Sequence, residues 1–537
     1  MILAFLSALA LYALPFLVGW LVFGKTIRWH IIPLMGITAI AYGIWRMNSP
    51  YPNSLNWDLF EHQSIVTAIR DGHWGVFPSL LSDTFRFDGY TTLFHTAIAL
   101  AQSIFNPKIL GFWWMAEAFH LFSAVVAAYV LTAHISKNRT AGLLAGLFSA
   151  FFFESSIVFA PLMLIPQTVA AVLWTFGLSY LLGTERPNTW YMALLSLLLV
   201  AMHMIVGGAG VLLYVLAGIL MRIPYHKVLW LIGGIVGSAS LYIGLNAVVS
   251  MLPLSSINYG EAGAYMQNTT DTLSTMRLWY GLFPLALFPI GYFFAATQGK
   301  VRTIIATIIF ATAFAVVLSK APYAMKFMSL ARYPMIAVIA VGMSTLFADM
   351  GKKTTLIATG ILIIALGTIF TVNTNEWKAW LITNGTATHV STDDQQIARY
   401  LSTHATTGTM LISDPATQYI LEGISGVNSQ GGAYMNDQSR TAFQMAFTAT
   451  EAATMTNAFR SIVDTVSTTT PTTRYIAISG RTTEWMRSSE PQRHDITYNI
   501  WRPTGLSVID HIELERIAAI LGKPPVYVNA SYALFAI

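Results

Sequence analysis

Long apolar runs separated by short polar turns dominate residues 1–372 of this sequence. A helix of about 20 apolar residues crosses the hydrocarbon core of a bilayer, so the run lengths and flanking charges predict about twelve membrane-spanning helices. They are expected near residues 2–24, 30–46, 109–133, 140–158, 161–183, 190–203, 205–221, 228–250, 278–298, 302–319, 333–349 and 354–372. The two segments that meet at His203 are short for separate spans, and one broken helix pair entering a cavity is the alternative.

Basic residues recur in the turn after every second predicted span. These turns contain Lys25 and Arg28, Lys137 and Arg139, Arg186, Arg222 and Lys227, Lys300 and Arg302, and Lys352 and Lys353. The positive-inside rule places such turns in the cytoplasm. The loop 47–108, the loop 252–277 and the tail from residue 373 are then extracytoplasmic, and the protein is expected to be a multi-pass protein of the plasma membrane.

The polar segments also carry patterns of regular structure. In the loop 47–108, Asn56 is a candidate N-cap for a helix that ends at Arg70, and an apolar helix is expected from Thr91 to Phe105. The tail mixes element types. It predicts helices at Asp393–His404 and Pro415–Glu422, strands at Thr409–Asp414 and Arg474–Ser479, and strands in Pro525–Ile537 with a turn at Asn529.

The expected fold is therefore an all-α polytopic membrane bundle in residues 1–372, followed by a small extracytoplasmic α/β domain in residues 373–537. Composition agrees with this picture. Hydrophobic residues make up 55% of the chain and charged residues only 10%, against roughly a quarter charged in soluble proteins, and the mean hydropathy is +0.57. The body has 19 Lys and Arg against 11 Asp and Glu, whereas the tail has 11 against 14. These values exclude a soluble nucleic-acid-binding protein, although the pI is near 9.1.

The absence of cysteine from all 537 residues removes thiol catalysis, disulfides and Cys-based zinc sites. The strongest group of polar residues is instead Asn56-Trp57-Asp58-Leu59-Phe60-Glu61-His62, in the first extracytoplasmic loop. Asp58 and His62 are four residues apart, so they share one face of a helix, with Glu61 beside them. Such a carboxylate can act as a general base or a metal ligand. The alternative is that Asp58 only complements the positive end of its helix.

Further features follow this group along the chain. They are the segment Tyr90-Thr91-Thr92-Leu93, a long span, the basic turn Ser136-Lys137-Asn138-Arg139 and an Ala/Gly/Leu-rich helix after that turn. Over residues 30–372 the chain resembles the GT-C superfamily of membrane glycosyltransferases that use polyprenyl-phosphate sugars. Those proteins typically carry an acidic residue in a helical first outer loop, then an aromatic, Pro-rich approach such as Tyr-Pro-Pro-Leu. Tyr90–Leu93 stands in that place without the prolines.

By that resemblance, Asp58 is the catalytic carboxylate of an inverting hexosyl- or pentosyltransferase of the cell envelope, with His62 and Glu61 beside it. The donor would be a polyprenyl-phosphate sugar, and the acceptor a glycan, lipid or protein. Glu154 is the candidate second carboxylate or metal ligand, with a solvated helix end as the alternative. A divalent metal, Mg²⁺ or Mn²⁺, is left open because no Asp-x-Asp pair occurs in the outer loops. No nucleotide or redox cofactor is expected.

Three basic residues fall on the predicted outer face, against the positive-inside bias: Lys320, Lys326 and Arg332. Cations at this depth can neutralise the phosphate of a lipid donor, and a guanidinium can hold two of its oxygens at once. The alternative is that the three side chains extend towards lipid headgroups.

Other polar residues are weaker candidates. His95, His203 and Glu261 are possible cavity-lining residues, Glu117 and His120 read as a structural pair within a span, and the loop Ser255–Arg277 is long enough to cover a substrate. The Trp-Trp-Asp motif of oligosaccharyltransferase catalytic subunits is missing, which argues against sequon-directed glycosylation. Two further classes stay open: a polytopic transporter or flippase, and a membrane protein that binds lipid-linked sugars without turnover.

Overall fold

Helices form the greater part of the computed structural model. The structure describes residues 2–12, 30–47, 58–70, 76–77, 85–86, 93–152, 164–222, 282–318, 327–384, 390–406, 409–413, 415–429, 453–454, 457, 474–480, 482–483 and 508–536. Up to residue 384 the described residues contain the helices Ile2–Tyr12, α2 (Ile31–Met47), α3 (Asp58–Arg70), α4 (Leu93–Phe105), α5 (Ile109–Ser136), α6 (Arg139–Phe151), α7 (Pro166–Gly183), α8 (Thr189–Met202) and α9 (Met204–Leu220). They continue with α13 (Leu282–Thr297), α14 (Val301–Leu318), α15 (Phe327–Ala348) and α16 (Lys352–Asn384). A short antiparallel pair of strands, β1 (Val76–Phe77) and β2 (Phe85–Arg86), follows α3.

Helices lie at the predicted spans wherever the structure describes them. Within the described residues, three are long and apolar enough to cross a membrane by themselves: Ile109–Ser136, Phe327–Ala348 and Lys352–Asn375. Shorter apolar helices accompany them, and the predicted span 228–250 lies outside the described residues. A membrane helical bundle therefore accounts for the body, while the number of about twelve crossings stays a prediction.

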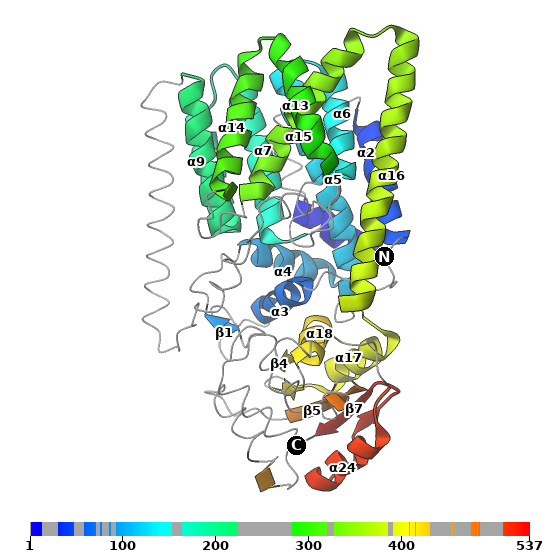
Figure 1. Ribbon diagram of the computed structural model, residues 1–537. Coiled ribbons are helices and arrows are strands. Elements are labelled where there is room, and N and C mark those ends of the chain that lie inside the picture. Colours follow the sequence, from blue (N-terminus) through cyan, green and yellow to red (C-terminus); the bar gives the residue numbers. More distant parts are fainter. Residues whose placement is uncertain are drawn as a thin grey trace.

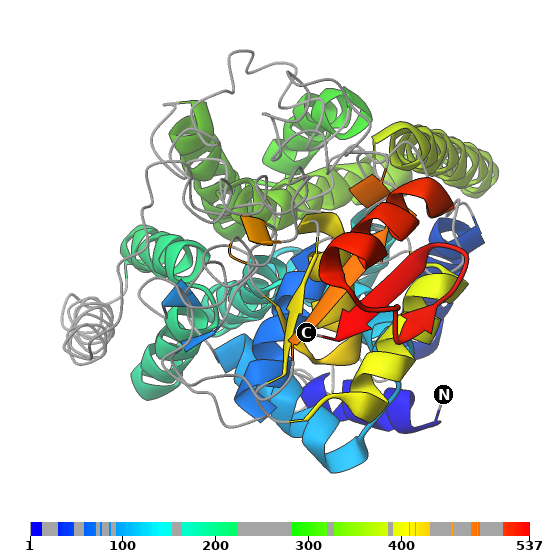
Figure 2. The same ribbon diagram turned by 90° about the horizontal axis from the view of Figure 1, so that it is seen from below.

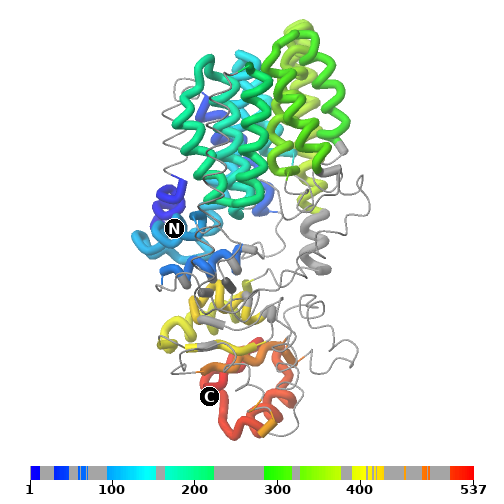
Figure 3. The backbone as a smooth tube through the Cα atoms, turned by 90° about the vertical axis from the view of Figure 1, so that its left-hand side faces the viewer, coloured from blue at the N-terminus to red at the C-terminus, as the bar shows by residue number. Residues whose placement is uncertain are grey.

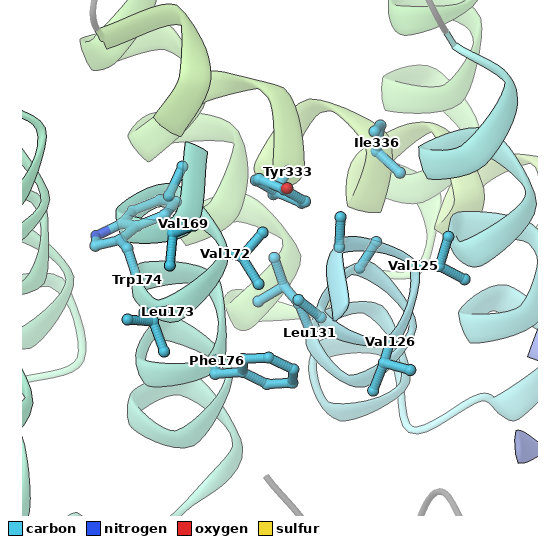
Figure 4. Packing of buried hydrophobic residues seen from close by; sticks show 14 of the residues in the cluster. Val125, Val126, Leu131, Val169, Val172, Leu173, Trp174, Phe176, Tyr333 and Ile336 are labelled. Carbon is cyan, nitrogen blue, oxygen red and sulfur yellow. The ribbon is translucent and has the colours of Figure 1, made fainter. Parts of the chain in front are cut away.

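The core of the bundle lies where α5, α7 and α15 meet. Figure 4 shows their side chains interdigitating, among them Leu131 of α5, Val172 of α7 and Tyr333 of α15. All three are buried. The backbones of α13 and α15 approach each other closely at two glycines. A Cβ atom added to Gly342 would lie 2.5 Å from the Cα atom of Gly291. Small residues at such crossings let two apolar helices pack tightly inside a bilayer.

The basic turn between α5 and α6 has clear local determinants. Lys137 adopts the left-handed conformation (φ 55°) that ends α5, and the Asn138 side chain accepts hydrogen bonds from the backbone N–H groups of Thr140 and Ala141, which begins α6. The Nζ atom of Lys300 donates to the carbonyl oxygen of Ser136 at 2.8 Å. A cation at the end of a helix also complements its dipole.

The start of α15 differs from the sequence prediction. The span was expected from residue 333, but the helix begins at Phe327 and contains Pro334. A proline inside a helix removes one backbone hydrogen bond, and neighbouring helices compensate for that loss in a membrane bundle. Arg332 consequently lies within a helix rather than in a loop. Similarly, α16 continues to Asn384, past the expected end of its span at residue 372.

The tail contains a mixed five-stranded sheet in the order β4-β3-β5-β7-β6. Its elements are α17 (Thr392–His404), β3 (Met410–Ile412), α18 (Pro415–Ser425), β4 (Asn428–Ser429), β5 (Arg474–Ser479), α24 (His511–Leu521), β6 (Tyr527–Val528) and β7 (Tyr532–Ala536). β3 pairs in parallel with β4 and β5, whereas β7 is antiparallel to β5 and β6. The turn expected at Asn529 is confirmed, since its side-chain oxygen accepts from the backbone N–H groups of Ser531 and Tyr532.

The elements form three layers along the long axis of the molecule. Figures 1 and 3 show the apolar bundle at one end, α3 and α4 beneath it, and the sheet of the tail at the other end. Seen from below in Figure 2, the tail covers part of that end of the bundle. Helices α3 and α4 and the described elements of the tail therefore lie together at one end of the bundle. The boundary between two domains at residue 372 stays a prediction.

Candidate functional site

The candidate site is built on α3, whose first residue is Asp58. The predicted helix is confirmed, and it begins within the Asn56–His62 group that the sequence singles out. The side chains of Asp58 and Glu61 lie outside the described set, as does Asn56. What the structure describes is how the helix that carries them is held.

His62 and His95 form a buried pair between α3 and α4. The Nδ1 atom of His62 lies 3.0 Å from the Nε2 atom of His95, and the side chains are 2% and 0% exposed. Burial lowers the pKa of His62 from 6.5 to about 3, because a charged imidazolium loses its hydration there. His62 is therefore neutral at physiological pH. Which ring donates the hydrogen bond depends on the tautomer.

A second polar contact lies one residue further along α3. The Oε1 atom of Gln63 accepts hydrogen bonds from Nε2 of Gln102 at 2.8 Å and from Nε1 of Trp113 at 3.0 Å, and Nε2 of Gln63 donates to Oε1 of Gln102 at 3.1 Å. We call these three residues the Gln63 network. It joins α3 to α4 and α5 in the buried interior.

The sequence analysis did not identify the Gln63 network. A signal for it was present, since His95 and Gln102 are seven residues apart and therefore share one face of the otherwise apolar α4. Polar side chains at such positions need partners when buried. The partner residues on α3 and α5 are not evident from local spacing.

Arg332 lies in α15 with a side chain only 5% exposed. One terminal guanidinium nitrogen donates to the carbonyl oxygen of Ser149 at 3.3 Å and to that of Phe152. These carbonyls are at the C-terminal end of α6, where the helix dipole favours a cation. The expected loop position is thus wrong for Arg332, because the residue lies in a helix and its side chain points into the protein, towards the C-terminal end of α6, whereas its depth in the membrane stays a prediction. The residues Glu154, Lys320, Lys326 and Glu261 lie outside the described residues.

His203 separates α8 from α9 and serves as the N-cap of α9. Its Nδ1 atom accepts a hydrogen bond from the backbone N–H of Val206 at 3.2 Å. An added Cβ on Gly207 would lie 2.2 Å from the carbonyl oxygen of Leu199, so the two helices pack closely at this break. The structure thus gives His203 a capping role at the break that the sequence predicts.

Glu117 and His120 are both buried on α5, but they do not form the expected pair: neither ring nitrogen of His120 has a hydrogen-bond partner among the described residues. Around them, Tyr42 of α2 donates to the carbonyl oxygen of Trp114 at 2.8 Å, and the guanidinium of Arg46 lies 4.7 Å from the centre of a Trp114 ring. These contacts join α2 to the N-terminal half of α5.

Solved structures of membrane glycosyltransferases have a similar fold. ArnT from Cupriavidus metallidurans bound to undecaprenyl phosphate matches 95% of this chain and 98% of its own, with a TM-score of 0.55 at 12% identity. The archaeal oligosaccharyltransferase AglB from Archaeoglobus fulgidus, in complex with an inhibitory peptide and a dolichol-phosphate, matches 86% of this chain and 71% of its own (TM-score 0.51, 11% identity). The mycobacterial arabinofuranosyltransferase AftD matches 85% of this chain but only 37% of its own (TM-score 0.53, 15% identity). All three are GT-C glycosyltransferases.

The chain has the GT-C fold. The resemblance seen in the sequence is confirmed at this level, although no protein-family model and no curated protein matches the sequence. At 11–15% identity, the similarity between this chain and these structures concerns the fold alone. Roles of individual residues in this chain rest on its own geometry.

A metal site is not formed by the described residues alone. AglB has also been solved with zinc and sulfate (TM-score 0.50, 12% identity), so metal binding occurs on this fold. Within the described part of this chain, no three His, Asp or Glu side chains come together, and the neighbouring His62 and His95 are engaged with each other. These two rings do not make up a ligand set for Mg²⁺ or Mn²⁺, which prefer oxygen ligands.

Proposed function

We propose that this protein is an integral membrane glycosyltransferase that moves a sugar from a polyprenyl-phosphate carrier to an extracytoplasmic acceptor, with inversion at the sugar carbon. The observation that carries the proposal is the placement of α3. In a chain with the GT-C fold, this helix begins at Asp58 and lies between the apolar bundle and the tail, at the end of the bundle where α4 and α18 also lie.

The proposed reaction needs one base and one group of cations. The Asp58 carboxylate accepts the proton of the acceptor hydroxyl, whose oxygen attacks C1 of the sugar from the face opposite the phosphate. A new C1–O bond forms as the bond between C1 and the phosphate oxygen breaks. The polyprenyl phosphate leaves with the bonding electron pair, so its negative charge grows in the transition state and is stabilised by nearby cations.

Arg332, Lys326 and Lys320 are proposed to supply these cations. Arg332 is the member of this group that the structure describes, and its guanidinium reaches the carbonyl of Phe152, two residues before Glu154. In this proposal Arg332 holds the start of the segment with the second carboxylate and faces the donor phosphate from inside the protein. Lys320 and Lys326 precede α15 and would approach the phosphate from the membrane surface.

The proposal is tested by turnover of the purified full-length protein with synthetic polyprenyl-phosphate sugars, read out as release of polyprenyl phosphate. Asp58→Asn keeps the shape of the side chain and removes its charge, so turnover is expected to fall by roughly 10²-fold or more. The matched control is Asp349→Asn, at an exposed aspartate just after α15, which should turn over like wild type. Normal turnover of Asp58→Asn would exclude Asp58 as the base. Failure of the wild-type protein to release polyprenyl phosphate from mannosyl or arabinosyl donors would exclude the proposed reaction.

A further inference from the structure

The tail touches α3 directly, through α18. At Gly423 of α18 an added Cβ atom would lie 3.0 Å from the Cα atom of Phe60 and 3.0 Å from its Cδ1 atom. Phe60 is 1% exposed and lies on α3, two residues after Asp58. A Cβ contact of 3.0 Å is tighter than nearly all real ones, so a larger residue at position 423 requires α3 and α18 to move apart by a few tenths of an ångström.

The contact continues along α3 for about two turns. Gly426, in the left-handed conformation (φ 76°) after α18, lies so that an added Cβ would be 3.0 Å from Cγ2 of Thr67. On the same helix, Ile420 is buried and Ile424 packs on the same apolar cluster as Phe60. Figure 1 shows α18 beneath α3, between α3 and the sheet of the tail.

The contacts of α3 with the bundle have a different chemistry. His62 and the Gln63 network bond α3 to α4 and α5, whereas Phe60 and Thr67 meet the tail. The two sets adjoin at Thr67, because Nε2 of Gln63 also donates to the Thr67 hydroxyl at 3.2 Å. The helix therefore has two supports, one from the membrane body and one from the tail.

We propose that α18 of the tail is a positioning element for the helix that carries the catalytic base, and that Gly423 is its positioning residue. This inference rests on the proposed glycosyl transfer and adds a role for the tail in the same site. A reacting group must be held within a fraction of an ångström of its productive geometry, and a displacement of about 1 Å costs about 10²-fold in rate. A side chain at position 423 would contact the backbone of Phe60. Because backbone atoms cannot rotate away as the end of a flexible side chain can, the contact is expected to displace α3 itself.

The experiment compares Gly423→Ala and Gly423→Val with wild type in the full-length protein. The matched control is Gly360→Ala on α16, where an added Cβ meets nothing within 4 Å. We expect kcat for transfer to fall about 10-fold for alanine and further for valine, while KM for the polyprenyl-phosphate sugar changes less than about twofold. Hydrogen exchange of the α3 amides should become faster in both variants and stay unchanged in the control.

Two failures are distinguishable. A wild-type protein without transfer activity overturns the proposed function, and this inference with it. An active wild type with unchanged kcat in Gly423→Val, despite faster exchange in α3, overturns the positioning role of the tail alone. A parallel loss of kcat, donor affinity and melting temperature in Gly423→Ala also overturns it, because that pattern is expected of general destabilisation.

Discussion

His62 and His95 are 33 residues apart in the chain, yet their ring nitrogens lie 3.0 Å from each other in the interior of the protein. This pair fixes α3 to α4 one turn after the proposed catalytic Asp58. Since both rings are buried, the contact depends on their protonation. It therefore makes the stability of this region sensitive to pH.

Acid should destabilise the protein through His62. The pKa of His62 is lowered to about 3 by burial, so the unfolded state, with a pKa near 6.5, takes up protons more readily. This contribution to stability is complete above about pH 6.5 and is lost as the pH falls towards 3. Between pH 7.5 and 4.5 the loss is roughly 2 to 3 kcal/mol. We expect the melting temperature of His62→Gln to fall less over this range than that of wild type. The exposed His404→Gln is the control, and equal pH dependence of wild type and His62→Gln would contradict the prediction.

The Gln63 network predicts an order of stabilities. Gln63→Leu leaves the N–H groups of Gln102 and Trp113 without their acceptor, whereas Gln102→Leu leaves Trp113 bonded to Gln63. A buried polar group without a partner costs about 1–3 kcal/mol. Chemical denaturation in detergent should therefore rank wild type above Gln102→Leu, and Gln102→Leu above Gln63→Leu. The reverse order of the two variants would show that the network does not hold α3 in this way.

Substitution of Arg332 should affect both stability and donor use. Arg332→Ala removes the bonds to the end of α6, so the melting temperature should fall. It also removes the proposed charge-assisted contact to the donor phosphate, which is worth about 1.5–3 kcal/mol, so kcat/KM for the polyprenyl-phosphate sugar should fall roughly 10- to 150-fold. Arg332→Lys should restore part of this loss, because an ammonium lacks the planar fork of donors. Lys352→Ala, at the start of α16, is the charge control. If Arg332→Ala lowers the melting temperature but leaves donor kinetics intact, the residue is structural only.

The absence of cysteine makes the topology easy to test with single introduced cysteines. Arg70→Cys at the end of α3 and Ser402→Cys in α17 are exposed positions on the side of the bundle that is proposed to be extracytoplasmic, while Lys353→Cys is exposed at the start of α16. A membrane-impermeant maleimide should label the first two in intact cells. It should label Lys353→Cys only after permeabilisation. Labelling of Lys353→Cys with protection of the other two would reverse the orientation.

Much of the secondary structure could be predicted from the sequence because its signals are local. The helix from Asp58 to Arg70, the strand Arg474–Ser479 and the turn at Asn529 follow from capping, alternation and turn chemistry within a few residues. The start of α15 was missed for the same reason. Pro334 and Arg332 are local end signals for a helix, and only packing against α6 and α13 explains why the helix extends through them.

The contacts between residues of the candidate site could not be predicted from the sequence. Arg332 and Ser149 are 183 residues apart, and no spacing rule connects Gly423 with Phe60. Sequence patterns indicate that a polar side chain on an apolar helix needs a partner, but they do not identify it. The partner is decided by which helix faces touch.

Hydropathy by itself determined that this chain forms apolar helices, and the tertiary structure decided which of them form the interior. Ile109–Ser136 and Lys352–Asn375 are both apolar enough to cross a membrane, yet 83% of an 18-residue stretch of the first and only 17% of one of the second are buried inside the protein. Lipid tails and leucine side chains are equally apolar, so an apolar surface is satisfied by either. Small residues, helix ends and a few buried polar pairs then decide which helices pack together, and these act only between segments that the fold has already brought into contact.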